Sequence, residues 1–274
     1  MKRLLVALAL ALLAGCASGP VIDRSFTAVS QDSRAQFLIL HYTALDFPTS
    51  LKVLTEAGVS SHYLVRDNPP TIYQLVDENR RAYHAGASSW KGQTQLNAAS
   101  IGIEIVNLGY QTTPGGRTYF EFPSNQIDAV IALVKKIVAE HGIRPDRVLA
   151  HSDIAPQRKP DPGPLYPWKR LADEGLIVWP NKDLVAQKKL LYDQQLPDID
   201  WFQQTLARFG YAVPLNGQFD EETVRVIAAF QMKYRPSLFD GMPDAETAAM
   251  LEVLTTPPAD PKEILAGSTD ALMK

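Results

Sequence analysis

The segment from Ala150 to Gly163 holds residue types that can do chemistry together. It places a histidine, a lysine and several carboxylates in one proline-rich stretch directly after a short apolar run. An imidazole and a carboxylate are good ligands for a borderline metal ion such as zinc. A lysine beside them can stabilise negative charge that develops on a substrate oxygen. By itself the pattern also fits a solvated loop, so a site here depends on residues elsewhere in the chain.

Two further residues occupy positions that suit such a site. His41 follows the apolar run Phe37 to Leu40, just as His151 follows its own apolar run, and functional groups concentrate where buried strands end. Glu104 interrupts the apolar pattern from Ile101 to Val106. In a cavity of low polarity, the pKa of this carboxyl would rise toward the working range of a general base. On a half-exposed sheet, the same residue would only face solvent.

The other histidines and the cysteine indicate no second site. His62 lies inside a strand pattern, which favours a packed core histidine, and His141 ends a helix beside Gly142, where histidines cap carbonyl groups. Cys16 is the only cysteine, so no internal disulfide can form. No Ser-His-Asp spacing or nucleophile-elbow pattern occurs, which disfavours covalent catalysis.

The elements that must position these residues alternate between strands and helices, which predicts an α/β (α+β) fold with a central mixed sheet flanked by helices. We expect Asp46 and Ser124 to cap the two helices and Gly58 and Gly142 to end them. From residue 198 onward, apolar residues at helical spacing predict a small domain of three short helices. The expected strands are 37–41, 61–66, 71–76, 100–106 and 147–150, and the expected helices are 47–57 and 124–141.

The N-terminus has the pattern of a secretion signal. Lys2 and Arg3 precede an apolar run that ends in Leu13-Ala14-Gly15-Cys16, which resembles a bacterial lipobox with Cys16 as the lipidated residue. That resemblance implies a periplasm-facing lipoprotein in the outer membrane of a Gram-negative bacterium; the alternative is a signal peptide with an incidental cysteine. The net charge of −3 over 274 residues gives no electrostatic argument for binding nucleic acid.

These patterns divide the chain into six expected segments. The first two are a signal peptide at 1–15 and a tether at 16–34, and the main domain covers 35–180. A linker at 181–197 leads to the helical domain at 198–256, and a tail at 257–274 is expected to be disordered because it is proline-containing and polar.

Several motifs in this order resemble a known family, the zinc-dependent N-acetylmuramoyl-L-alanine amidases of type 2, which share a fold with the peptidoglycan recognition proteins. The likeness is to the outer-membrane lipoprotein branch of that family. Residues 219–223 and 226–231 resemble a peptidoglycan-binding three-helix module. The motifs are Leu40-His41-Tyr42-Thr43, Ser61-His62-Tyr63-Leu64-Val65, Tyr83-His84-Ala85-Gly86, Asn97 with Ser100-Ile101-Gly102-Ile103-Glu104, and the segment His151 to Gly163.

The resemblance assigns roles to individual residues. It implies one zinc ion held by His41, His151 and Asp161, with Asp153 as the competing carboxylate. Glu104 would be the general base and Lys159 would stabilise the oxyanion. The implied reaction cleaves the amide bond between N-acetylmuramic acid and the L-alanine of the stem peptide, in peptidoglycan or muropeptides. The loop residues that would edge the cleft, as candidates for substrate contacts, are His84, Trp90, Asn97 and Arg158; a packing role is the equal alternative for the tryptophan.

Two other functions remain open on the sequence. A peptidoglycan-binding protein with an inactive cleft would lack a metal ligand or the base, whereas this chain has residues for both. A zinc peptidase that cuts within the stem peptide would use the same chemistry and differ only in its pocket. The oligomeric state is not indicated by any pattern in the chain.

Overall fold

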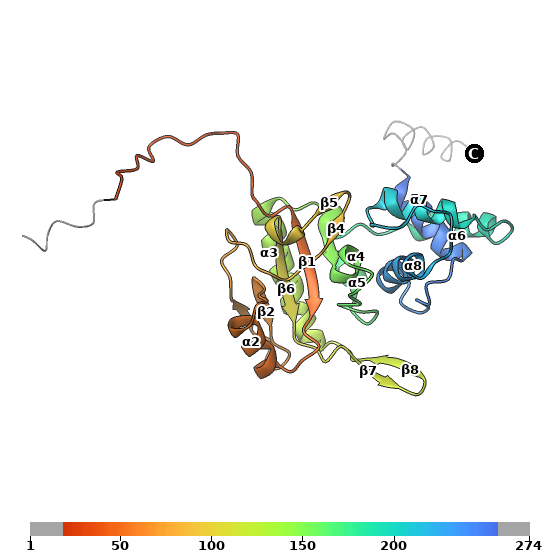
Figure 1. Ribbon diagram of the computed structural model, residues 1–274, viewed down its shortest axis with the longest axis horizontal. Helices are drawn as coiled ribbons and strands as arrows, with labels where there is room; N and C mark the ends of the chain where they lie inside the picture. Colours follow the sequence, from red (N-terminus) through yellow and green to blue (C-terminus); the bar gives the residue numbers. More distant parts are fainter. Residues whose placement is uncertain (1–18, 257–274) are drawn as a thin grey trace, which may run out of the picture. The chain divides into compact units, whose positions relative to one another are not determined.

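The computed structural model describes residues 19–256, which form helices and strands from Phe37 to Thr255 (Figure 1). The chain divides into a unit that ends at Asp32 and a second unit that begins at Ser33, and residues 19–32 contain neither helix nor strand. The expected signal peptide, Cys16 and the tail at 257–274 lie outside the described residues. Within the described part, no helix combines the length and apolarity that a membrane crossing requires.

A five-stranded sheet with the order β3-β2-β6-β1-β9 forms the centre of the main domain. Strands β2, β6, β1 and β9 run parallel to their neighbours, and β3 pairs antiparallel with β2. The sheet is therefore mixed, which confirms the predicted fold class. Its strands are β1 (Phe37–Tyr42), β2 (Tyr63–Val65), β3 (Ile72–Gln74), β6 (Ser100–Ile105) and β9 (Val148–Ala150).

Helix α3 (Ser124–His141) covers one face of this sheet (Figure 1). Its apolar side packs with Leu38 and Leu40, the even-numbered residues of β1, in one buried cluster. The helix ends at Gly142, whose φ of 64° is the left-handed conformation that glycine adopts readily, as predicted. The expected cap at Ser124 is wrong, because Pro123 is the N-cap residue and no side chain caps this end.

Helix α2 (Phe47–Glu56) begins as predicted at Asp46, whose side chain accepts a hydrogen bond from the Thr49 N–H at 3.0 Å. Residues 83–99, whose Gly, Ala, Ser and polar residues indicate a loop, contain short elements, and a hairpin that the sequence did not predict follows them. The short elements are β4 (Ser89–Trp90), β5 (Gln93–Thr94) and η1 (Leu96–Ala98), and the hairpin is β7 (Tyr110–Thr113) with β8 (Gly116–Tyr119). The remaining elements of the main domain are η2 (Pro145–Arg147), α4 (His151–Ile154) and α5 (Trp168–Asp173).

The C-terminal domain contains the three predicted helices, each capped by an aspartate side chain. They are α7 (Ile199–Phe209), α8 (Glu221–Tyr234) and α9 (Ala245–Thr255). The segment expected to be a linker instead forms a fourth helix, α6 (Lys182–Tyr192). Glu252 on α9 accepts hydrogen bonds from Lys188 at 2.8 Å and from the Tyr192 hydroxyl at 2.5 Å, so α6 packs onto this domain.

The second face of the sheet is buried against α4 and the C-terminal helices. Phe37 and Ile39, the odd-numbered residues of β1, share one apolar cluster with Phe202 and Phe230. A buried ionic group, which we call the Asp153 cluster, lies in the same region. Its members are Asp153, Lys233 and Tyr211, with Lys233 Nζ at 2.7 Å and the Tyr211 hydroxyl at 2.6 Å from the carboxylate oxygens.

Candidate active site

Three of the predicted residues converge at the end of the parallel strands. His41 lies near the end of β1, and His151 follows β9, whose Ala150 is paired with Leu40 of β1. The Nδ1 atoms of the two imidazoles are 2.9 Å apart, and Oδ2 of Asp161 is 3.1 Å from the first and 3.0 Å from the second. All three side chains are buried, so their donor atoms face one another in a small, dry volume.

Hydrogen bonds on the far side of each ring leave these Nδ1 atoms free to act as ligands. Nε2–H of His151 donates to the Ala85 carbonyl at 3.2 Å. The Ser100 hydroxyl donates to a backbone carbonyl at 2.6 Å, so its oxygen accepts from His84 Nε2–H at 3.2 Å. His84 Nδ1 then accepts from His41 Nε2–H at 3.0 Å. This is the pattern in which an outer partner fixes the tautomer of a metal-binding histidine.

The charges in this group suit a divalent cation. Burial, aided by the neighbouring His151, lowers the pKa of His41 to about 4, although Asp161 opposes the shift. Burial also sets the pKa of His84 well below its ordinary value. For Asp161, burial alone would raise the pKa, but the two histidines outweigh it and the pKa is lowered. Two imidazole nitrogens and one charged carboxylate are a donor set that fits zinc.

Glu104 lies beside His41 on the adjacent parallel strand, in direct register. Both side chains therefore project from the same face of the sheet. Its Oε2 atom is buried and has no hydrogen-bond partner among residues 19–256. Burial raises the pKa of Glu104 well above its ordinary value, the Asp161 charge adds to the rise, and Lys159 opposes it. A carboxyl group in this state is suited to take up a proton and release it again.

Glu104, His151 and Asp161 line one cavity of about 360 Å³. Lys159 and Arg158 form part of its wall beside the converging ligands, and Val53, Leu54 and Val59 form an apolar wall. The Arg158 guanidinium donates to the Ala85 carbonyl at 2.8 Å and to the Ala87 carbonyl at 2.7 Å. The cavity therefore combines a possible metal position, a raised-pKa carboxyl and a lysine within one space open to a ligand.

The expected substrate contacts divide into two groups. Arg158 and His84 line the cavity, although the His84 ring is occupied in holding His41. For Trp90 the packing alternative holds and the substrate contact does not: its side chain is only 1% exposed, because it packs against Phe209 and Tyr211 of the C-terminal domain. The expectation for Asn97 is also wrong.

The amide oxygen of Asn97 accepts hydrogen bonds from the N–H groups of His84 at 3.0 Å and of Ala85 at 2.8 Å. Asn97 therefore shapes the loop that carries His84 and does not line the cavity. Gly102 is a further residue of this site that the sequence analysis missed, since a Cβ atom there would lie 2.4 Å from the His84 ring. A glycine inside a strand pattern is the signal that indicates such a close approach.

Asp153, the competing carboxylate, does not point at the two histidines. Its Oδ2 atom accepts from the Ala150 N–H at 2.8 Å and contacts Lys233 of α8, so it holds the turn from which His151 emerges. The structure thus separates the two carboxylates of this segment: Asp161 faces the imidazoles, and Asp153 faces the C-terminal domain.

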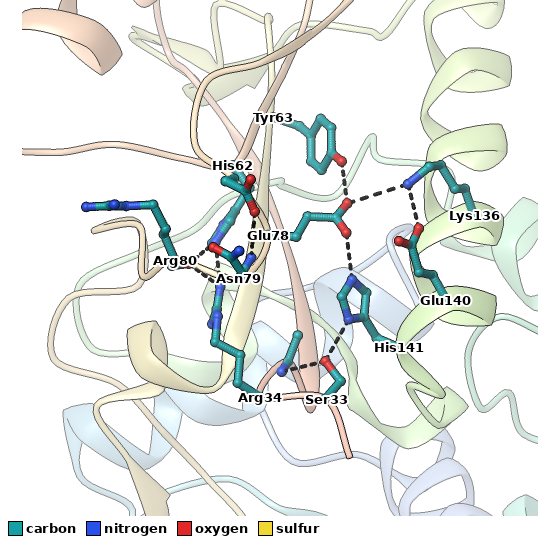
Figure 2. A network of polar contacts seen from close by, with 12 residues as sticks. Ser33, Arg34, His62, Tyr63, Glu78, Asn79, Arg80, Lys136, Glu140 and His141 are labelled. Carbon is teal, nitrogen blue, oxygen red and sulfur yellow. Dashed lines mark hydrogen bonds and ion pairs between the residues drawn. The ribbon is translucent and has the colours of Figure 1, made fainter. Parts of the chain in front are cut away.

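A second group of possible ligands lies elsewhere, at Glu78, Glu140 and His141 (Figure 2). Lys136 Nζ is 2.7 Å from Glu140 and 3.7 Å from Glu78, so an ammonium already neutralises these carboxylates. His141 bonds to Glu78 at 2.7 Å, and its other nitrogen bonds to the Ser33 hydroxyl at 2.6 Å. We interpret the group as a satisfied polar network that fastens the chain before β1 to the end of α3. The structural role expected for His141 is confirmed, although it bonds side chains and does not cap carbonyls.

Comparisons with known proteins agree with this geometry. The family model for N-acetylmuramoyl-L-alanine amidase matches residues 31–164, and a model for a peptidoglycan binding domain matches residues 195–251. The chain is 45% identical over 265 residues to N-acetylmuramoyl-L-alanine amidase AmiD of Escherichia coli K12, which covers 91% of this chain and 95% of that protein.

Two solved structures resemble the whole described molecule. A complex of E. coli AmiD with anhydro-N-acetylmuramic acid-L-Ala-D-γ-Glu-L-Lys matches with a TM-score of 0.77 and 44% identity, covering 85% of this chain and 93% of that one. AmpDh3 of Pseudomonas aeruginosa, in complex with anhydromuramic pentapeptide, matches with a TM-score of 0.79 and 37% identity, covering 85% and 96%. By its fold, its site and these likenesses, the chain belongs to the N-acetylmuramoyl-L-alanine amidase family.

Proposed function

We propose that this protein is a zinc-dependent amidase that hydrolyses the bond between N-acetylmuramic acid and the L-alanine of the stem peptide. The observation that carries the proposal is the convergence of His41, His151 and Asp161 at the edge of the cavity that His151, Asp161 and Glu104 line. The muropeptides bound by the related AmiD and AmpDh3 support peptidoglycan or its fragments as the substrate.

In this proposal the two Nδ1 atoms and the Asp161 carboxylate hold one zinc ion. Zinc, when bound, supplies Lewis acidity and lowers the pKa of water to about 7. Glu104 takes a proton from the attacking water and passes it to the departing nitrogen, which leaves as the free amine of L-alanine. Lys159 stabilises the negative charge on the carbonyl oxygen, and the loss of one such donor typically costs about 10²- to 10³-fold in rate.

Two substitutions separate metal binding from proton transfer. We expect Glu104→Gln to lower kcat about 10³-fold and to keep one zinc per chain, because only the general base is lost. Asp161→Ala should lose both turnover and zinc. Metal content measured by atomic absorption, together with turnover of a soluble muropeptide, checks both results. Glu121→Gln, an exposed carboxyl outside the cavity, is the control. Wild-type turnover by either site variant would contradict the assignment.

Product analysis distinguishes the proposal from its two rivals. Purified sacculi are incubated with the protein, with and without a chelator, and the released fragments are identified by mass. Free stem peptides with an intact L-alanine amine support the amidase. Fragments cut inside the stem peptide support a peptidase, and binding without products supports an inactive binding protein.

We also propose that the protein is a periplasm-facing lipoprotein of a Gram-negative outer membrane, attached through a lipid on Cys16. The support is the sequence from Lys2 to Cys16, with its basic start, apolar run and lipobox-like ending. We expect Cys16→Ser to move the protein from the outer-membrane fraction to the soluble fraction and to abolish labelling with radioactive palmitate. An unchanged membrane fraction for this variant would contradict the proposal.

A further inference from the structure

A second groove, of about 350 Å³, adjoins the catalytic cavity. It shares Tyr110, Arg158, Lys159 and Pro160 with that cavity, so the two spaces meet along the segment that carries Lys159. The groove takes its walls from the β7-β8 hairpin, from this segment and from α8 of the C-terminal domain. We call it the cationic groove, and its principal residues are Tyr110, Arg117, Arg158, Lys159, Arg225 and Met232.

The groove carries an excess of positive charge. Four of its lining residues are cationic, and no carboxylate of the described residues is part of its lining. Arg225 forms an ion pair with Glu221 on the exposed side of α8. Within residues 19–256, Arg117, Arg158 and Lys159 have no carboxylate within ion-pair distance. An anionic ligand would therefore meet cations that are still available to it.

The arginines are held in place before any ligand arrives. The Arg117 guanidinium lies over the Tyr110 ring at 4.4 Å. Arg158 is fixed by its bonds to backbone carbonyls, and Arg225 donates to the Gln157 carbonyl at 3.2 Å. A guanidinium has five N–H donors, so each keeps some for a ligand. Side chains ordered in advance lose less entropy on binding.

The two connected spaces differ in chemistry. The catalytic cavity has an apolar wall of Val53, Leu54 and Val59, none of which lines the cationic groove. The anionic part of a substrate would therefore be favoured in the groove.

The proposed substrate has such an anionic part. In anhydro-N-acetylmuramic acid-L-Ala-D-γ-Glu-L-Lys, which the related AmiD binds, the γ-linkage of D-glutamate leaves its α-carboxylate free. The terminal lysine carries a second carboxylate. The sugar has no ionised group once its lactyl carboxyl is in the amide bond. Both negative charges thus lie beyond the L-alanine, on the side that departs.

We propose that the cationic groove binds the carboxylates of the stem peptide beyond L-alanine, and that Arg117 and Arg225 are specificity-determining residues for them. This inference rests on the proposed amidase function. It makes the C-terminal domain part of the substrate site, because Arg225 belongs to α8. Binding here sets KM and leaves the chemical step alone, because neither arginine lines the catalytic cavity.

The test compares two soluble substrates that differ only in charge. One is N-acetylmuramoyl-L-Ala-D-γ-Glu-L-Lys, and the other is the same molecule with both carboxyl groups converted to amides. We expect Arg117→Gln and Arg225→Gln each to raise KM for the carboxylate substrate about fivefold, which is the size of a partly exposed ion pair. KM for the amide substrate and kcat for both substrates should change less than twofold.

Arg208→Gln is the matched control, since Arg208 is an exposed arginine of the same domain outside the groove. The inference is overturned if the groove variants keep the wild-type KM for the carboxylate substrate, or if KM rises equally for both substrates. Failure of the proposed function looks different, because wild-type protein loaded with zinc would then cleave neither substrate. Added salt should reduce the difference in KM between the carboxylate and amide substrates, because it screens the ion pairs.

Discussion

His62 shows how a buried imidazole outside the catalytic cavity can make the fold sensitive to acid. Its Nδ1 atom accepts a hydrogen bond from the Gly102 N–H at 3.0 Å, and its Nε2 atom lies 3.0 Å from the Arg80 carbonyl. The bond to Nδ1 requires the neutral ring, because a protonated Nδ1 could not accept it. Burial is the main cause that lowers the pKa of His62 to about 4, while the Arg80 carbonyl opposes the shift and Arg34 adds to it. The expected packed core histidine is confirmed at this position.

This lowered pKa predicts a loss of stability in mild acid. Between the folded pKa of about 4 and the unfolded value of 6.5, the unfolded chain binds more protons than the folded one. Stability contributed by His62 is therefore present above pH 6.5 and is lost as the pH falls through this window. From pH 7 to pH 5, we expect the loss from this residue to be about 2 kcal/mol.

Urea unfolding of wild-type protein and of His62→Gln at pH 7 and pH 5 measures this contribution. The variant should be less stable at pH 7 but should lose about 2 kcal/mol less than wild type between the two pH values. Equal losses in the two proteins would show that His62 does not titrate in this window.

At the scale of single residues, the sequence identified several residues of the site, but it did not show which side chains they contact. His41, His151 and Glu104 were recognisable because each follows or interrupts an apolar strand, and strand order then brings them together. The role of His84 could not be read in this way. It depends on a ring orientation that Ser100 fixes and on the space that Gly102 leaves. Both of these residues lie on β6, whereas His84 lies in a loop. The packing of Trp90 could not be predicted either, because the aromatic rings that it contacts belong to another domain.

At the scale of elements, the Asp153 cluster joins α8 of the C-terminal domain to the start of α4. Lys233 and Asp153 are 4% and 1% exposed, so their 2.7 Å ion pair is desolvated. The same ammonium lies 4.3 Å from the centre of the Trp168 ring and 3.3 Å from the Val148 carbonyl. Removal of one partner from such a pair leaves an uncompensated buried charge.

We therefore expect Lys233→Met to lower the free energy of unfolding by about 3 kcal/mol. The buried Asp153 carboxylate would lose its counterion and would keep only the hydrogen bonds from the Ala150 N–H and the Tyr211 hydroxyl. Lys188→Met is the matched control, since Lys188 pairs with Glu252 at 2.8 Å but both groups are partly exposed. That variant should lose less than about 1 kcal/mol. Chemical denaturation of both variants measures the difference, and equal losses would contradict a special role for the buried pair.

Among the elements, those with strong local patterns were predicted and those without were missed. Helix α3 has a continuous apolar face and a glycine stop, and it occupies the predicted residues. The β7-β8 hairpin was missed because its residues are mostly polar and exposed, so no alternation marks it. Helix α6 lies in a segment that was expected to be a linker because it is charged and only partly helix-prone, and in the structure Val185 is its one buried residue. It is stabilised by its contact with α9, which is a tertiary effect.

At the scale of the whole molecule, the domain boundaries remain predictions, although the structure indicates how the parts depend on one another. Phe37, Ile39, Leu149 and Trp90 of the main domain belong to the same apolar cluster as the C-terminal helices. The sequence predicted both sets of apolar residues. It could not show that they pack against each other, because helical spacing identifies an apolar face and not its partner.

This shared cluster constrains how such a protein can be taken apart, by an experimenter or by evolution. An isolated main domain would expose Trp90, Phe37 and Ile39 to water as one hydrophobic patch, which favours aggregation. The charge of Asp153 would also lose its partner. A shortened descendant would need new polar side chains on that surface before it could lose the C-terminal helices and stay soluble. Deletion of either domain would expose part of this shared cluster, so the folding of the remaining domain must be measured before its function.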